Sequence, residues 1–304
     1  MRNSYLYEKS VKRATLCAVL VSIFLIIIKL ITCWLTGSMS LFASLLDSSI
    51  DLLASGLNFF LVRYALKPAD DDHTFGHGKA ESLAALAQST FIIGSASILL
   101  LSSIKSIIHP SDIELPLLGI IISAISTVIT CILVIYQKYV ITLTKSKAIQ
   151  ADMLHYSSDM FMNIAVIFAL GLSWYGITFA DAAFAFFIAL FIFYNAYKIA
   201  YNAIQDLLDR ALPDGDNMKV ADIVASFPEV HGFHDLKTRQ AGPVKFIQLH
   251  IELDDNMPLI KAHAIADSIE KLISKEFSPA IVIIHQDPLS VVPVEMMYIK
   301  NQPK

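Results

Sequence analysis

The chain has 304 residues, of which 55% are hydrophobic and only 16% are charged. Soluble domains usually carry about a quarter of charged residues, so this composition excludes an ordinary soluble protein and predicts a membrane protein. The 23 Lys and Arg against 27 Asp and Glu give a net charge of −4, which offers no basic surplus for a nucleic-acid partner. The three cysteines include no CxxC pair, and they therefore indicate neither a disulfide framework nor a thiolate metal site.

Six apolar stretches are long enough to cross a bilayer, which needs roughly 20 residues per helix. They cover residues 16–35, 39–62, 83–108, 116–136, 154–175 and 177–200. Basic residues lie before the first stretch, between the second and third, and between the fourth and fifth, whereas the other three connections contain none. The positive-inside rule then predicts that both termini are cytoplasmic.

The last third of the chain has a different character. Residues 1–211 hold 14 basic and 14 acidic residues, whereas residues 212–304 hold 9 and 13. The periodicity predicts a helix, two strands, a helix and a strand, over residues 216–227, 232–240, 244–253, 259–277 and 280–285. This αββαβ order favours a small α+β sandwich of the ferredoxin or metallochaperone kind, with its helices on one side of the sheet. We expect two domains, an all-α six-helix transmembrane bundle over residues 1–211 and a cytoplasmic domain over residues 212–304.

Two of the predicted spans carry ionisable pairs spaced i, i+4, which places both members on one helix face. Asp47 and Asp51 lie in LLDSSIDLL, and His155 and Asp159 lie in MLHYSSDMF. An ionisable group in a span costs at least about 2.5 kcal/mol on insertion scales, and a divalent cation would compensate that cost. If the two faces oppose each other, they supply three oxygens and one nitrogen, as a closed Zn²⁺ site requires. The alternative is a wetted, structural cluster near a cytoplasmic helix end, paired with Lys29.

Two further groups of acids and histidines lie outside the spans. Asp70, His73 and His77 follow the second span in the order D-x-x-H-x-x-x-H, which can close around a metal; a solvated acidic loop is the alternative. In the tail, the candidate ligands are His234, His250, His263, His285 and Asp287. They are scattered over four predicted elements, so only the fold could assemble them.

The six spans, the two intramembrane pairs and the histidine-bearing tail together resemble the cation diffusion facilitator family. Segments such as TGSMSLFASLLDSSIDLLAS, PADDDHTFGHGKAESLAALAQS, ADMLHYSSDM, LLDRALPD and IIHQDP are similar to its bacterial zinc and ferrous-iron efflux subgroup. The resemblance covers essentially the whole chain. It implies a homodimer in the lipid bilayer of the bacterial inner membrane that exports Zn²⁺, with Fe²⁺ or Cd²⁺ as further substrates.

The resemblance also implies which residues act. It assigns the transport site to Asp47, Asp51, His155 and Asp159, and a loop site to Asp70, His73 and His77. It assigns a binuclear cytoplasmic site to His234, His250, His263, His285 and Asp287, with Asp287 bridging the two metals. Lys79 and Asp209 match the family's charge pair, which links the loop to the start of the tail domain.

A metal-free transport site with three ionised carboxylates would not persist inside a bilayer, so protons should replace the metal. This reasoning predicts metal and proton antiport by alternating access. An intramembrane protease is a rival, but there is no HExxH motif, and the two aspartates of the second span share one helix. A cation channel gated by a metal-sensing tail is the other rival, and a channel cannot accumulate its ion against a gradient.

Overall fold

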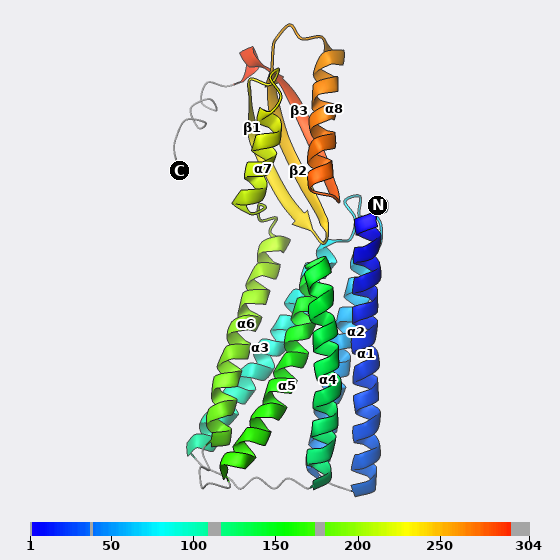
Figure 1. Cartoon of the computed structure of the whole chain (residues 1–304), viewed down its shortest axis with the longest axis vertical. Helices are drawn as coiled ribbons and strands as arrows, with labels where there is room; N and C mark the ends of the chain where they lie inside the picture. Colours follow the sequence, from blue (N-terminus) through cyan, green and yellow to red (C-terminus); the bar gives the residue numbers. More distant parts are fainter. Residues whose placement is uncertain (1, 37–38, 109–116, 174–179, 293–304) are drawn as a thin grey trace. The chain divides into compact units, whose positions relative to one another are not determined.

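The computed structural model describes residues 2–36, 39–108, 117–173 and 180–292 (Figure 1). Some side chains at the ends of these ranges, and within the helices that border them, lie outside the description. The chain divides into two compact units, one over Leu6–Ile204 and one that contains the tail from Gln205 onward. The short connections expected after the first, third and fifth spans fall largely on residues outside the described ranges.

Six long helices make up the first unit. They are α1 (Arg2–Thr36), α2 (Met39–Ala65), α3 (Lys79–Ile108), α4 (Leu117–Thr144), α5 (Lys147–Ser173) and α6 (Ala180–Leu207). Four of them contain stretches that are long and apolar enough to cross a membrane, namely Leu6–Leu35, Lys79–Lys105, Ala124–Thr144 and Ala183–Leu207. The other two, α2 and α5, carry the ionisable pairs, and parts of them lie outside the described side chains. The predicted helical membrane domain is therefore confirmed, while the count of six spans is confirmed only in part.

The helices of this unit contact one another through small buried residues and a few hydrogen bonds between helices. The helix α3 packs against both α2 and α5, and α4 packs against α5. Ala96 of α3 and Ala196 of α6 are buried in one apolar cluster, as expected where small side chains let helix backbones approach. The hydroxyl of Tyr156 on α5 shares hydrogen bonds with Ser22 on α1 at 2.6 Å and with Ser55 on α2 at 2.7 Å. Tyr156 thereby ties three helices together, beside the predicted ligand on α5.

A buried carboxylate organises the end of the bundle where α4 meets α5. Glu81, in the first turn of α3, accepts a hydrogen bond at 3.0 Å from the backbone N–H of Lys147, the first residue of α5. The hydroxyls of Ser146 and Tyr7 donate to the same carboxylate. An anion at a helix N-terminus satisfies free N–H groups and complements the helix dipole. Glu81 therefore connects α1, α3 and α5.

The tail folds in the predicted αββαβ order. Its elements are α7 (Asp214–Ala225), β1 (Gly232–Ala241), β2 (Val244–Leu253), α8 (Leu259–Glu276), β3 (Ala280–Pro288) and the short 3-10 helix η1 (Leu289–Val291). The sheet has the order β1-β2-β3, with β1 antiparallel and β3 parallel to β2. Ile247, Leu249 and Ile251 of β2 are buried together with Ile269 of α8 and Val220 of α7. The two helices thus cover one face of the sheet, and the alternate residues of β2 lie on the other face.

Candidate metal centres

Three groups of carboxylates and imidazoles in the described residues have ligand atoms that all lie within 4.8 Å of one another. One is a membrane cluster of Asp51, His155 and Asp159, one is a loop cluster of Asp70, His73 and His77, and one is a tail cluster of His234, His250 and Asp287. All nine of these residues are candidate ligands from the sequence. Each cluster brings together the number and type of donors that a divalent cation can use.

The membrane cluster forms where α2 and α5 lie against each other. His155 Nε2 lies 3.1 Å from Asp51 Oδ1, and these two side chains are 14% and 24% exposed. Asp159 follows His155 by one turn of α5 and offers its carboxylate to the same group. Asp47 lies in α2 one turn before Asp51, but its side chain is outside the described part of the chain. The two ionisable faces of α2 and α5 therefore oppose each other at Asp51 and His155.

The sequence also allowed a purely structural cluster in which Lys29 pairs with the acids. Lys29 lies on α1 and contacts α2, the helix that carries Asp51. Its ammonium donates a hydrogen bond to Ser48 Oγ of α2 at 2.6 Å. Ser48 is three residues before Asp51, and residues with this spacing lie on adjacent turns of one helix face. The positive charge of Lys29 therefore lies about one helical turn from the Asp51 position along α2.

The loop cluster is shaped by its own backbone. The N–H of His73 donates to Asp70 Oδ1 at 2.7 Å, and this hydrogen bond is the main cause that lowers the pKa of Asp70 from its usual 3.8. Gly76 has a φ of +79°, a conformation that favours glycine. His77 is buried, with its Nδ1 3.2 Å from the Pro68 carbonyl oxygen and its Nε2 3.4 Å from Asp70 Oδ2. A proton on Nδ1 that donates to this carbonyl would leave Nε2 free to bind a metal.

The tail cluster results from strand register. His234 pairs with His250 across β1 and β2, and His250 pairs with His285 across β2 and β3, so three imidazoles form one row. Asp287 lies two residues beyond His285, hence on the same face of β3. Its carboxylate lies 2.8 Å from His250 Nδ1, 3.3 Å from His234 Nε2 and 3.1 Å from His285 Nε2. A single carboxylate therefore contacts all three imidazoles, as a bridging ligand would.

Sequence reasoning missed one buried acid, Glu252, that contacts this cluster. Glu252 pairs with Asp287 in the sheet, and its Oε1 lies 3.2 Å from Nδ1 of His234. It also lies two residues after His250 on β2, and this alternation is the signal that could have identified it. His263, by contrast, lies exposed on α8, which packs on the opposite face of the sheet, and it is not in the tail cluster.

The predicted pair of Lys79 and Asp209 stays a prediction, because its members belong to different units. Lys79 is the first residue of α3. Asp209 follows α6, has a φ of +59°, and accepts a hydrogen bond at 3.3 Å from Nη1 of Arg239. Asp209 is therefore attached to the sheet of the tail.

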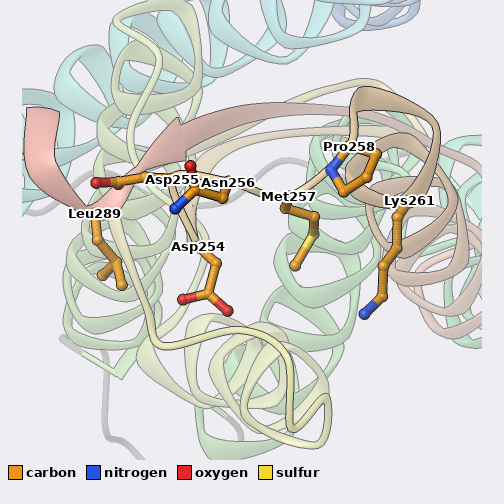
Figure 2. A pocket seen from close by; sticks show the side chains of 7 residues that line it. All are labelled: Asp254, Asp255, Asn256, Met257, Pro258, Lys261 and Leu289. Atoms are coloured by element: carbon orange, nitrogen blue, oxygen red, sulfur yellow. The ribbon is translucent and has the colours of Figure 1, made fainter.

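A separate cavity of about 550 Å³ lies at the turn between β2 and α8. Figure 2 shows the side chains that line it. It is lined by Asp254, Asp255, Asn256, Met257, Pro258, Lys261 and Leu289. Asp255 accepts a hydrogen bond from the backbone N–H of Ser290 at 2.9 Å, and Asp254 lies 3.3 Å from His231 Nε2. This lining contains no predicted metal ligand, so the cavity is distinct from the three clusters.

The chain matches two family models that follow one another along the sequence. The cation efflux transmembrane domain matches residues 15–208, and the cytoplasmic domain of cation efflux proteins matches residues 212–289. The first of these alone covers more than half of the chain.

Full-length relatives give the same result. The cation-efflux pump FieF of Cronobacter sakazakii is 54% identical over 287 residues, which are 94% of this chain and 96% of the relative. The pump of the same name from Salmonella arizonae is 52% identical over 290 residues, which are 95% and 97% of the two chains. A solved structure described as the metal-bound C-terminal domain of the CzcD transporter from Thermotoga maritima is 30% identical and covers 26% of this chain and 93% of its own. Its TM-score of 0.25 is too low to support an argument.

The intramembrane protease alternative is therefore wrong, because the matched family consists of transporters and not of enzymes. The long apolar helices agree with a protein that resides in a membrane. The chain belongs to the cation efflux family, also called the cation diffusion facilitators, and is a membrane transporter that exports divalent metal cations.

Proposed function

We propose that this protein exports Zn²⁺ in exchange for protons, and that Asp47, Asp51, His155 and Asp159 bind the transported ion. The observation that carries the proposal is the 3.1 Å separation of His155 Nε2 and Asp51 Oδ1, with Asp159 in the same group. A closed set of carboxylate and imidazole donors suits Zn²⁺. Fe²⁺ and Cd²⁺ are further substrates of the same donor set.

Proton exchange follows from the cost of charge in a bilayer. Metal binding requires neutral imidazole and ionised carboxylates, so it displaces protons from the site. When the metal leaves, uncompensated carboxylates are expensive in the membrane, and protons take its place. The site would take up metal when open to the cytoplasm, and it would release metal when open to a more acidic exterior.

The remaining clusters fit a regulated homodimer in the bacterial inner membrane. Basic residues around the predicted spans support cytoplasmic termini, which would place the loop and tail clusters in the cytoplasm. The tail would bind two cations through His234, His250, His285 and Asp287. A bound cation would offset the repulsion between two acidic tails.

The test is metal uptake by proteoliposomes across an imposed pH gradient, with Zn²⁺, Cd²⁺, Fe²⁺ and Co²⁺ offered separately. Asp51→Ala should slow uptake by more than about 100-fold, because even the hydrogen-bonding partners of metal ligands account for 10–100-fold in affinity or activity. Asp267→Asn is the matched control, since Asp267 is an exposed acid of α8 that pairs with Lys271. Normal uptake by folded Asp51→Ala protein would refute the assignment of the site.

The same assay separates the antiporter from the metal-gated channel. Accumulation of the metal above its equilibrium concentration, driven by the pH gradient alone, requires coupling to protons. A channel would only let the metal equilibrate. Loss of accumulation on addition of a protonophore completes the test.

A further inference from the structure

A second polar cluster lies inside the helical bundle, next to the membrane cluster. Asp152 of α5 is fully buried, and its Oδ2 accepts a hydrogen bond at 2.7 Å from Nε2 of Gln137 on α4, which is also fully buried. Asn58 and Ser55 of α2 lie close to the same carboxylate. Asn58 is only 2% exposed. Three helices therefore direct polar side chains into one closed interior position.

Several atoms of this cluster have no hydrogen-bond partner within the described ranges. They are Asp152 Oδ1, Gln137 Oε1, and both Oδ1 and Nδ2 of Asn58. Buried polar atoms almost always have a partner, and an orphaned set in one place indicates a bound water or ion. The unpaired atoms belong to all three side chains, so they point to one shared ligand.

The donor set identifies water as that ligand. A bare divalent cation would bind the oxygens, but only one carboxylate among the described side chains of this cluster could balance its charge. A water molecule can donate to Asp152 Oδ1 and to Gln137 Oε1 while it accepts from Asn58 Nδ2. Three such hydrogen bonds are typical of a buried structural water.

The cluster lies between the metal ligands of the membrane cluster and the end of the bundle where α5 begins, so a water bound there could carry protons. Asp152 lies three residues before His155 on α5, about 4.5 Å along the helix axis, on the side where α5 begins at Lys147. Asn58 lies seven residues after Asp51 on α2, two turns toward the same end of the bundle. The titratable neighbours of Asp152 are His155 and Tyr156 on its own helix. Its described neighbours from α2 and α4 are the uncharged side chains of Ser55, Asn58 and Gln137.

We propose that Asp152, Gln137 and Asn58 bind ordered water and form the path by which protons pass between the membrane cluster and the cytoplasmic side. The inference rests on the proposed proton exchange. When a metal ion binds, the proton displaced from a ligand moves to the bound water, and that water gives one of its own protons to Asp152 Oδ1. Asp152 then releases this proton toward the cytoplasm. The water gains one proton and loses one, so no further reactant is needed.

The experiment measures proton release when Zn²⁺ is mixed with the full-length protein in detergent, with a pH-indicator dye in a stopped-flow instrument. Asp152→Asn retains the shape of the side chain but cannot carry the proton. It should slow proton release at least tenfold and leave the equilibrium Zn²⁺ affinity within threefold of the unsubstituted protein. A role in folding or packing alone would not separate the rate from the affinity in this way.

Asn58→Leu is a second variant of similar volume that removes the donor and acceptor from α2, and it should slow proton release in the same direction. Ser126→Ala is the matched control. Ser126 is a buried residue of α4 whose hydroxyl also lacks a partner in the described part of the chain. It lies eleven residues from Gln137, about 16 Å along the helix, so its replacement should leave the rate unchanged.

The outcomes distinguish this inference from the proposed function. If the unsubstituted protein releases no protons when it binds Zn²⁺, proton exchange itself is wrong. If it does release protons, but folded Asp152→Asn and Asn58→Leu release them within twofold of its rate, only the proton path is wrong. Slow release by both variants, with normal release by Ser126→Ala, supports the path.

Discussion

Replacement of Glu252 tests whether the tail cluster is a metal site that depends on an oriented histidine. The Oε1 atom of Glu252 lies 3.2 Å from Nδ1 of His234, while Nε2 of the same ring lies 3.3 Å from Asp287 Oδ2. The carboxylate thus holds one nitrogen of His234, so that the other nitrogen faces Asp287. Glu252→Leu removes this acceptor and its charge while it keeps a side chain of similar size.

The expected effect follows from the burial of the pair. The side chains of His234 and Glu252 are 13% and 9% exposed, so water cannot easily replace the lost acceptor. Removal of a group that orients a metal-bound histidine typically costs about 10–100-fold in metal affinity. We expect a loss in this range for Glu252→Leu. Glu252→Gln keeps an acceptor oxygen but loses the charge, and its loss should be smaller.

The assay is Zn²⁺ competition against a fluorescent chelator, with full-length protein that also carries Asp51→Ala to silence the membrane cluster. His234→Ala in the same background defines the complete loss of one ligand. Asp267→Asn, which removes an exposed acid of α8, controls for the change in net charge. The reasoning is refuted if Glu252→Leu binds Zn²⁺ within twofold of its parent while His234→Ala does not.

Two further predictions concern local structure. Tyr156→Phe removes the hydroxyl that hydrogen-bonds to Ser22 and Ser55. At roughly 1 kcal/mol per hydrogen bond, the substitution should destabilise the bundle by about 2 kcal/mol. An unchanged midpoint of thermal unfolding in detergent would show that these hydrogen bonds do not stabilise the bundle. The carboxyl of Asp70 should titrate below its usual pKa of 3.8, because the His73 N–H favours its charged form. The ionised Asp70 carboxylate should therefore stabilise the loop above the usual carboxyl pKa, and this stabilisation should be lost as the pH falls through the lowered value. NMR titration of the labelled carboxyl carbon measures the pKa of Asp70, and a value of 3.8 or higher would disprove the prediction.

Helix periodicity was sufficient to anticipate which residues of the membrane cluster share a face. Residues spaced i, i+4 must project from one side of a helix, so the spacing of His155 and Asp159 needs no tertiary information. The contact between Asp51 and His155 was a weaker expectation, because it depends on which helices are neighbours. The opposition of the two faces made it reasonable, since one divalent cation between them would compensate the charges of both.

The sequence could not predict the strand register that brings the residues of the tail cluster together. The alternation of β2 shows that His250 and Glu252 share a face, but not which residues of β1 and β3 lie opposite them. Glu252 was missed because an acid in a strand usually faces solvent. Asp152 was missed for a related reason, since it lies just before the predicted span that begins at residue 154, where a carboxylate usually contacts water. In both cases, packing by other elements buries the carboxylate.

The membrane cluster and the loop cluster differ in their acids and in their surroundings. The membrane cluster holds Asp51 and Asp159, and Asp47 is a third acid of the proposed site, so departure of a divalent cation would leave negative charge where the bilayer makes charge expensive. The loop cluster has a single acid, Asp70, whose side chain is 53% exposed, so water can screen the excess positive charge. Loss of the cation from the loop needs no replacement charge, whereas loss from the membrane cluster does. We therefore expect metal release to be coupled to proton uptake at the membrane cluster and not at the loop.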